Sequence, residues 1–136
     1  MAPAPHEHRL RVRYGETDQM GVVHHANYLL YFEEGRTRMM RDLGVPYSEL
    51  EKEGWALPVR KAELRFRQSA RYDDELVVRT RIGRVGAASV EFLYEVIDAN
   101  NGQLLANGST ELACIDIRTP ERRVAMLPES LRRLMT

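Results

Sequence analysis

Residues 14–28, YGETDQMGVVHHANY, combine side chains that could carry out a hydrolysis. Asp18 supplies a carboxylate, which can attack a carbonyl carbon or activate a water molecule. Gly21 allows the loop to fold back on itself, and the adjacent His24 and His25 follow it. Few purely structural segments combine these residue types at this spacing, so we interpret the stretch as the functional site.

A helix is predicted directly after this stretch, and its direction decides what the loop can do. Small or apolar residues recur on one helical face at Tyr28, Phe32, Gly35, Met39 and Leu43. Asn27 is a candidate N-cap and Gly44 a candidate left-handed C-cap. Gly35 costs about 1 kcal/mol relative to alanine in mid-helix, so we expect another element to approach it closely. Free N–H groups and the helix dipole beside His25 then favour an oxyanion.

The same stretch resembles the signature of a known family. The residues that carry the resemblance are Thr17-Asp18-x-x-Gly21-Val22-Val23-x-x-x-Asn27-Tyr28, followed by Glu33 and Arg36. They are similar to hotdog-fold acyl-CoA thioesterases of the 4-hydroxybenzoyl-CoA thioesterase family, and more closely to its YbgC-like branch. The resemblance extends to the final strand. It implies hydrolysis of an acyl-CoA thioester without a cofactor, and an α+β hotdog fold with a five-stranded antiparallel sheet wrapped around one long central helix.

The resemblance also implies roles for individual residues. Asp18 matches the catalytic aspartate of the family, and His25 matches the position whose backbone N–H polarises the thioester carbonyl. We therefore take Asp18 and His25 as the catalytic candidates. As substrate-binding candidates we take Tyr14, Val23, His24, Asn27, Tyr28 and Glu33.

Each candidate also has a structural explanation. Asp18 could simply bond its own backbone in a turn, as aspartate commonly does before glycine. Asn27 could only cap the helix, Tyr14 could be a core residue on the inner face of its strand, and Glu33 could be a solvated helix residue. His25 could act through its backbone alone. The sequence does not separate Asp18 as nucleophile from Asp18 as general base, because both routes need one ionised carboxylate near the carbonyl.

Other functional classes are less well supported. A non-catalytic hotdog module that binds acyl-CoA or acyl carrier protein is the main alternative, and the aspartate at the matching position argues against it. A dehydratase of the same fold places its catalytic residues elsewhere on the central helix. Asp18, His24 and His25 lack a convincing further ligand, so we expect no metal site, and a two-histidine, one-carboxylate site is kept as the weaker alternative.

The composition sets further bounds. With 136 residues the chain is expected to form one domain over residues 1–136, with residues 1–7 flexible. Twenty basic residues balance 20 acidic ones, which gives no argument for nucleic acid as a partner or for a membrane surface. Cys114 is the single cysteine, which excludes an intrachain disulfide, and no apolar run approaches the length of a membrane span. We therefore expect a cytoplasmic protein.

Alternating apolar and polar residues predict strands over residues 8–14, 56–67, 76–82, 90–96 and 104–114. One strand, one helix and four further strands joined by short turns indicate an antiparallel α+β domain. Such a sheet leaves an uncovered edge and apolar outer positions, including Leu93 and Ile97. Together with the resemblance, this predicts a homodimer with the acyl-CoA site at its interface, assembling further into a homotetramer.

Overall fold

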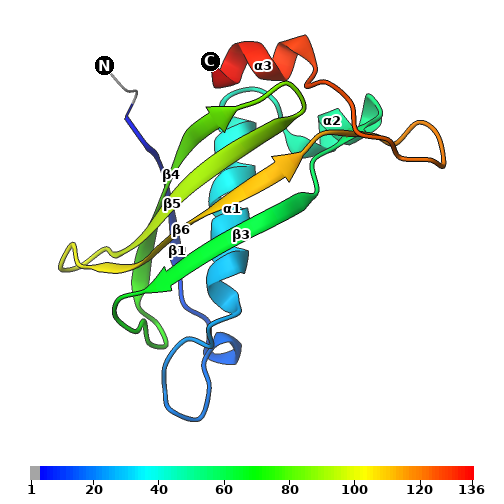
Figure 1. The fold of residues 1–136 in the computed structure, drawn as a ribbon. Helices are drawn as coiled ribbons and strands as arrows, with labels where there is room; N and C mark the ends of the chain where they lie inside the picture. The colour runs from blue at the N-terminus through cyan, green and yellow to red at the C-terminus, as the bar shows by residue number, and fades with distance from the viewer. Residues whose placement is uncertain (1–3) are drawn as a thin grey trace.

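The structure is a computed structural model that describes residues 4–136 (Figure 1). Its elements in chain order are β1 (His6–Arg11), η1 (Tyr14–Glu16), α1 (Asn27–Asp42), α2 (Tyr47–Lys52), β2 (Trp55–Ala56), β3 (Val59–Phe66), β4 (Glu75–Val85), β5 (Ser89–Asp98), β6 (Leu104–Ala113), β7 (Ile115–Asp116) and α3 (Glu129–Met135). Five strands form one antiparallel sheet that curves around α1, while β2 and β7 form a separate pair. The expected five-stranded sheet around one long helix is confirmed.

The order of strands in the sheet, β1-β4-β5-β6-β3, is not a simple succession of hairpins. Hairpins join β4, β5 and β6 as expected, but β3 pairs with β6 and not with β4. Residues 67–74 therefore cross the end of the sheet from one side to the other. Alternation of residue types shows only which segments are strands, so the sequence pattern could not reveal this crossing. It matters here because the crossing segment contacts the loop that precedes α1.

The buried side of α1 packs on the inner face of the sheet. Phe32 stacks on Tyr94 of β5, with ring centroids 4.3 Å apart. A Cβ added at Gly35 would lie 2.7 Å from side-chain atoms of Val78 and Thr80 on β4, which confirms the expected close approach. At the end of the helix the buried stripe runs through Met40, while Met39 is half-buried and Leu43 is exposed. Gly44 has a φ of +92°, as expected for a left-handed C-cap.

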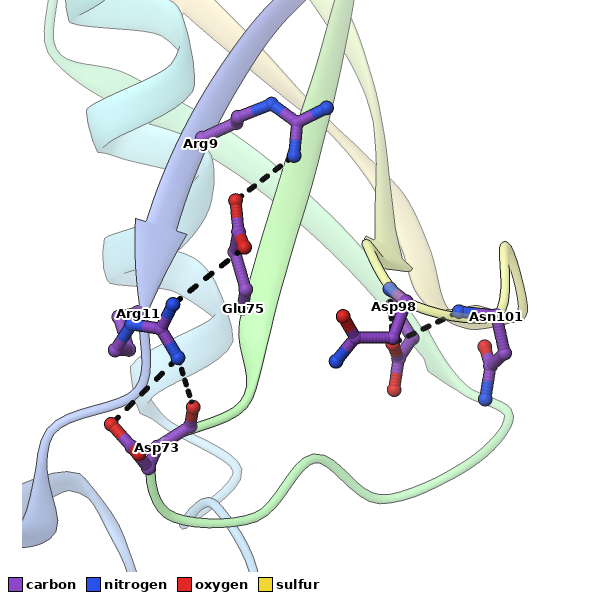
Figure 2. Close-up of polar contacts among 7 residues, drawn as sticks. Arg9, Arg11, Asp73, Glu75, Asp98 and Asn101 are labelled. Atoms are coloured by element: carbon purple, nitrogen blue, oxygen red, sulfur yellow. Dashed lines mark hydrogen bonds and ion pairs between the residues drawn. The ribbon is translucent and has the colours of Figure 1, made fainter.

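Strand β1 begins earlier than expected. It pairs with β4 from His6, opposite Thr80, to Arg11, opposite Glu75. Residues 6 and 7 therefore belong to the sheet and not to a flexible terminus, and residues 1–3 of that expectation lie outside the described residues. Arg9 and Arg11 lie 2.9 and 3.6 Å from carboxylate oxygens of Glu75, and Arg11 also donates to the carbonyl of Asp73 (Figure 2). These contacts tie the end of β1, where the candidate loop departs, to the start of β4.

Candidate active site

The loop between β1 and α1 folds back on itself as a short ladder. Thr17 pairs with Val23 in an isolated antiparallel bridge, and the N–H of Asp18 donates to the carbonyl of Val22 at 2.9 Å. Gly21 closes the turn with a φ of +79°, a conformation that glycine adopts without steric cost. Asp18 thus lies on one side of this ladder. The other side runs directly into α1, and the loop as a whole is at the bottom of Figure 1.

The carboxylate of Asp18 is half-buried and partly engaged. Its Oδ1 accepts the backbone N–H of Met20 at 2.9 Å. Asp18 therefore does bond its own backbone in a turn, as the structural explanation predicted. No Lys, Arg or His side chain of residues 4–136 lies within ion-pair distance of it. The negative charge of Asp18 is therefore not neutralised by a fixed cation within the described part of the chain.

The start of α1 offers hydrogen-bond donors. Ala26 is the N-cap and Asn27 the first helical residue, so the expected capping role of Asn27 is wrong. Its Nδ2 instead donates to the carbonyl of Glu16 at 3.0 Å, and its backbone N–H donates to the carbonyl of His24 at 2.9 Å. The N–H groups of His25 and Ala26 have no backbone acceptor among residues 4–136. They are free to bind an oxygen atom at the positive end of the helix dipole.

A pocket of about 190 Å³ opens beside the helix start. Its walls come from the loop, the first turn of α1 and the segment after β3: Val23, His25, Tyr28, Phe66, Arg67, Gln68 and Ser69. The hydroxyl of Tyr28 accepts the backbone N–H of Ala70 at 3.3 Å, and burial raises the pKa of this phenol. Three of the residues singled out in the sequence, Val23, His25 and Tyr28, therefore meet in one pocket.

The other two aromatic candidates, Tyr14 and His24, do not line this pocket. Tyr14 belongs to η1, is 76% exposed and packs edge-on against Tyr72, with ring centroids 5.4 Å apart. The expected inner-face position of Tyr14 is wrong, because β1 ends at Arg11 and the alternation no longer applies beyond it. His24 is exposed beside His25, with 4.2 Å between the ring centroids.

Glu33 lies away from the pocket. It is exposed on α1 and lines a separate groove of about 300 Å³, whose other residues are His8, Glu34, Thr37, Arg38 and Arg41. A single copy of the chain therefore gives Glu33 no place in the pocket beside His25.

Two residues that the sequence analysis did not single out hold the loop on the helix. Oε1 of Glu16 accepts the hydroxyl of Tyr31 at 2.9 Å, one turn into α1. Burial, followed by this hydrogen bond, raises the pKa of Tyr31, so the phenol stays protonated and acts as a donor at neutral pH. The proximity of Glu16 to Asp18 was visible in the sequence, but its pairing with a helix tyrosine was not.

The described part of the chain shows neither a metal cluster nor a membrane span. No three His, Cys, Asp or Glu side chains of residues 4–136 gather closely enough to hold a metal ion. Over the same residues, no helix combines the length and the apolar character needed to cross a membrane. The two-histidine, one-carboxylate arrangement considered for Asp18, His24 and His25 thus gains no support from the geometry.

Comparisons with known proteins extend over nearly the whole chain. Residues 12–134 match the family described as the thioesterase-like superfamily. The acyl-CoA thioester hydrolase YbgC of Escherichia coli O6:H1 is 34% identical over 122 residues, which cover 90% of this chain and 89% of that protein.

Solved structures share the same architecture. A hypothetical protein from Thermus thermophilus has a TM-score of 0.87 at 38% identity, and the match covers 95% of each chain. The 1,4-dihydroxy-2-naphthoyl-CoA thioesterase from Synechocystis has a TM-score of 0.87 at 28% identity, covering 95% of this chain and 93% of the other. The family match over residues 12–134 includes the loop between β1 and α1.

Proposed function

Because the chain belongs to the thioesterase-like superfamily and has its hotdog fold, we propose that it hydrolyses an acyl-CoA thioester to a free acid and CoA. The 34% identity to an acyl-CoA thioester hydrolase over 90% of the chain supports this activity. The family resemblance found in the sequence is thereby confirmed. The residue roles below are our proposal.

In the proposed reaction the thioester carbonyl lies at the start of α1. Its oxygen accepts hydrogen bonds from the free backbone N–H groups of His25 and Ala26. Negative charge builds up on this oxygen as the carbonyl carbon becomes tetrahedral, and the positive end of the helix dipole stabilises it. The acyl group occupies the pocket walled by Val23, Tyr28 and Phe66.

Asp18 acts on the carbonyl carbon by one of two routes. As a nucleophile, its carboxylate attacks the carbon, the C–S bond breaks, CoA leaves as the thiolate, and water then hydrolyses the mixed anhydride. As a general base, it takes a proton from a water molecule that attacks the same carbon, and the C–S bond breaks afterwards. In water labelled with heavy oxygen, label found in the Asp18 carboxylate after turnover would identify the nucleophilic route.

The observation that carries the proposal is the ladder that joins the side of the loop containing Asp18 to the start of α1. The carbonyl of Glu16 accepts both the N–H of His24 at 2.8 Å and the side-chain N–H of Asn27 at 3.0 Å. Asp18 follows two residues after Glu16 on the same side of the ladder, and we propose that its carboxylate faces the helix start, where the oxyanion would be stabilised. A hydrolysis needs this combination of carboxylate and donors.

Thiol release from a panel of acyl-CoAs tests the proposal. The panel runs from short aliphatic through long-chain to aromatic acyl groups, the protein is first treated with a chelator, and each substrate is scored by kcat/KM. We expect release with at least one class and no loss on chelation. Tight acyl-CoA binding without thiol release over hours would contradict the proposal and favour the non-catalytic binding module.

We further propose that two copies complete the site. β3 forms one edge of the sheet, where Phe66 and Val59 are 54% and 47% exposed, and Leu29 and Leu30 are exposed on α1. Pairing of the two β3 edges would join the five-stranded sheets into one continuous sheet and cover these side chains. Pairing of dimers into a tetramer would cover Leu93 on the outer face.

Light scattering at micromolar concentration tests the assembly. We expect the mass of a dimer or tetramer for the wild type and a shift toward monomer for Phe66→Glu, which places a charge on the β3 edge. Tyr72→Glu is the matched control, because Tyr72 is an aromatic residue of similar exposure outside that edge. A monomeric wild type, or equal effects of the two substitutions, would contradict the proposed interface.

A further inference from the structure

Glu16 links more segments of the candidate site than any of the residues that the sequence analysis selected. Its Oε1 accepts the backbone N–H of Arg13 and the hydroxyl of Tyr31, each at 2.9 Å. Its carbonyl accepts the N–H of His24 at 2.8 Å and the side-chain N–H of Asn27 at 3.0 Å. One residue therefore connects the end of β1, the returning side of the loop and the first two turns of α1.

The two halves of Glu16 fix different degrees of freedom. The carbonyl sets the spacing between the two sides of the ladder, because its partners His24 and Asn27 lie on the returning side. The carboxylate sets the angle of the loop against the helix, because Tyr31 is 1% exposed and cannot shift without disturbing the core. Only the carboxylate contribution can be removed by substitution of the side chain.

Asp18 has no comparable anchor of its own. The bond that its side chain accepts, from the N–H of Met20, lies within the same turn and does not connect the carboxylate to α1. Val22 and Val23 hold the returning side of the loop on the segment after β3, and Glu16, two residues before Asp18, supplies the side-chain contact of the outgoing side to α1. The direction of the Asp18 carboxylate relative to the helix start therefore depends on the side chain of Glu16.

We propose that Glu16 is the positioning residue of this site, which holds the Asp18 turn at the start of α1 through its hydrogen bonds to Tyr31 and Arg13. This inference rests on the proposed thioesterase function. Glu16 does not touch the reacting atoms. It acts through Asp18, so its loss should lower the rate of the chemical step and leave substrate binding intact.

Kinetics of Glu16→Ala and Glu16→Gln test the inference. Alanine removes both carboxylate hydrogen bonds, whereas the amide oxygen of glutamine can still accept them. We expect kcat to fall about tenfold or more in Glu16→Ala, as for the loss of one hydrogen bond to a charged group, with KM within about twofold. Glu16→Gln should recover most of the rate.

Glu91→Ala is the matched control. Glu91 is also a half-buried glutamate whose Oε1 accepts a backbone N–H, that of Arg84 at 3.2 Å, but it lies on β5 away from the loop. Its removal should leave kcat and KM unchanged. Amide hydrogen exchange over residues 17–26 gives a readout independent of activity, and it should accelerate in Glu16→Ala but not in Glu91→Ala.

The outcomes separate the two proposals. A wild type that releases no thiol contradicts the proposed function. The exchange measurement then still tests whether the side chain of Glu16 holds the loop on α1. An active wild type whose Glu16→Ala variant keeps its kcat, or loses rate only through KM, overturns the positioning role. If Glu16→Ala does not fold, Tyr31→Phe takes its place: it removes the phenol donor and keeps the ring, and an unchanged kcat in that variant also overturns the inference.

Discussion

Two turns of this protein share the same backbone chemistry, but only one of them lies at the candidate active site. Asp18 accepts the N–H of the residue two positions later at 2.9 Å on Oδ1, and the N–H of Gly21 at 3.0 Å on its carbonyl. Asp98, drawn in Figure 2, accepts the N–H of Asn100, also two positions later, at 2.8 Å on Oδ1, and its carbonyl accepts the N–H of Gly102, four positions later instead of three, at 2.9 Å. Both glycines have a positive φ, +79° and +75°. An aspartate followed by such a glycine is therefore a turn, and does not by itself identify a catalytic residue.

The difference lies in what surrounds each turn. The Asp98 turn joins β5 to β6 and is tied to the sheet by the N–H of Ala99, which donates to the carbonyl of Glu75 at 2.9 Å. The Asp18 turn leads into α1, beside free N–H groups and a pocket of about 190 Å³. We infer that the capacity for chemistry comes from these neighbours, and that the turn only presents the carboxylate to them.

The largest expected effect separates the two aspartates. Asparagine can keep either turn, because its side-chain oxygen accepts the same hydrogen bond, but it lacks the ionised carboxylate. We expect Asp18→Asn to lower kcat about 10³-fold, within the range for loss of a general base, and Asp98→Asn to leave it unchanged. Thiol release and thermal unfolding of both variants check this. Full activity of Asp18→Asn would remove Asp18 from the mechanism.

A second pair of substitutions separates the backbone of residue 25 from its imidazole. His25 is the second residue of the turn closed by the bond from the N–H of Asn27 to the carbonyl of His24, a position that suits proline. His25→Pro removes the free N–H, so we expect kcat to fall about 10²- to 10³-fold, as for loss of one oxyanion donor. His25→Ala keeps the N–H and should cost only a few-fold.

The outcome is read from kcat of the two variants at saturating acyl-CoA, with circular dichroism to check that α1 is intact. If His25→Ala is as damaging as His25→Pro, the imidazole itself takes part in the reaction. If neither substitution lowers kcat, the thioester carbonyl is not bound at this helix start. That result would contradict the proposed role of the free N–H groups of His25 and Ala26.

The sequence predicted those parts of the site whose information is local. The turn at Asp18 and Gly21 and the helix that follows depend on residues close together in the chain, so residue types and spacing were enough. The ends of α1 were predicted to within a residue, and Gly35 was placed correctly against a neighbouring element. The prediction of Asn27 as the N-cap was wrong, because Asn27 is the first helical residue and its side chain donates to the carbonyl of Glu16.

The sequence did not predict the contacts that depend on distant segments. Phe66 reaches the pocket because β3 pairs with β6 at the edge of the sheet. Ala70 reaches the loop because residues 67–74 cross the end of the sheet, where the N–H of Val23 donates to the carbonyl of Ala70 at 2.8 Å. Alternation also failed to place Tyr14, because the strand ended three residues before it. Residue types and spacing also did not show that Glu33 lines a separate groove and not the pocket beside His25.

The smallest expected effect concerns the two glycines. Alanine at either position must adopt a left-handed conformation, which costs about 1–2 kcal/mol, and neither site adds a severe clash: a Cβ at Gly21 would lie 3.8 Å from Arg71, and one at Gly102 would meet nothing within 4 Å. Chemical denaturation should therefore show similar losses of stability in Gly21→Ala and Gly102→Ala. We expect kcat to fall only in Gly21→Ala, by a few-fold, because only that turn holds the carboxylate that we propose to be catalytic. Equal losses of kcat would mean that activity follows overall stability, and the distinction between the two turns would then lose its basis.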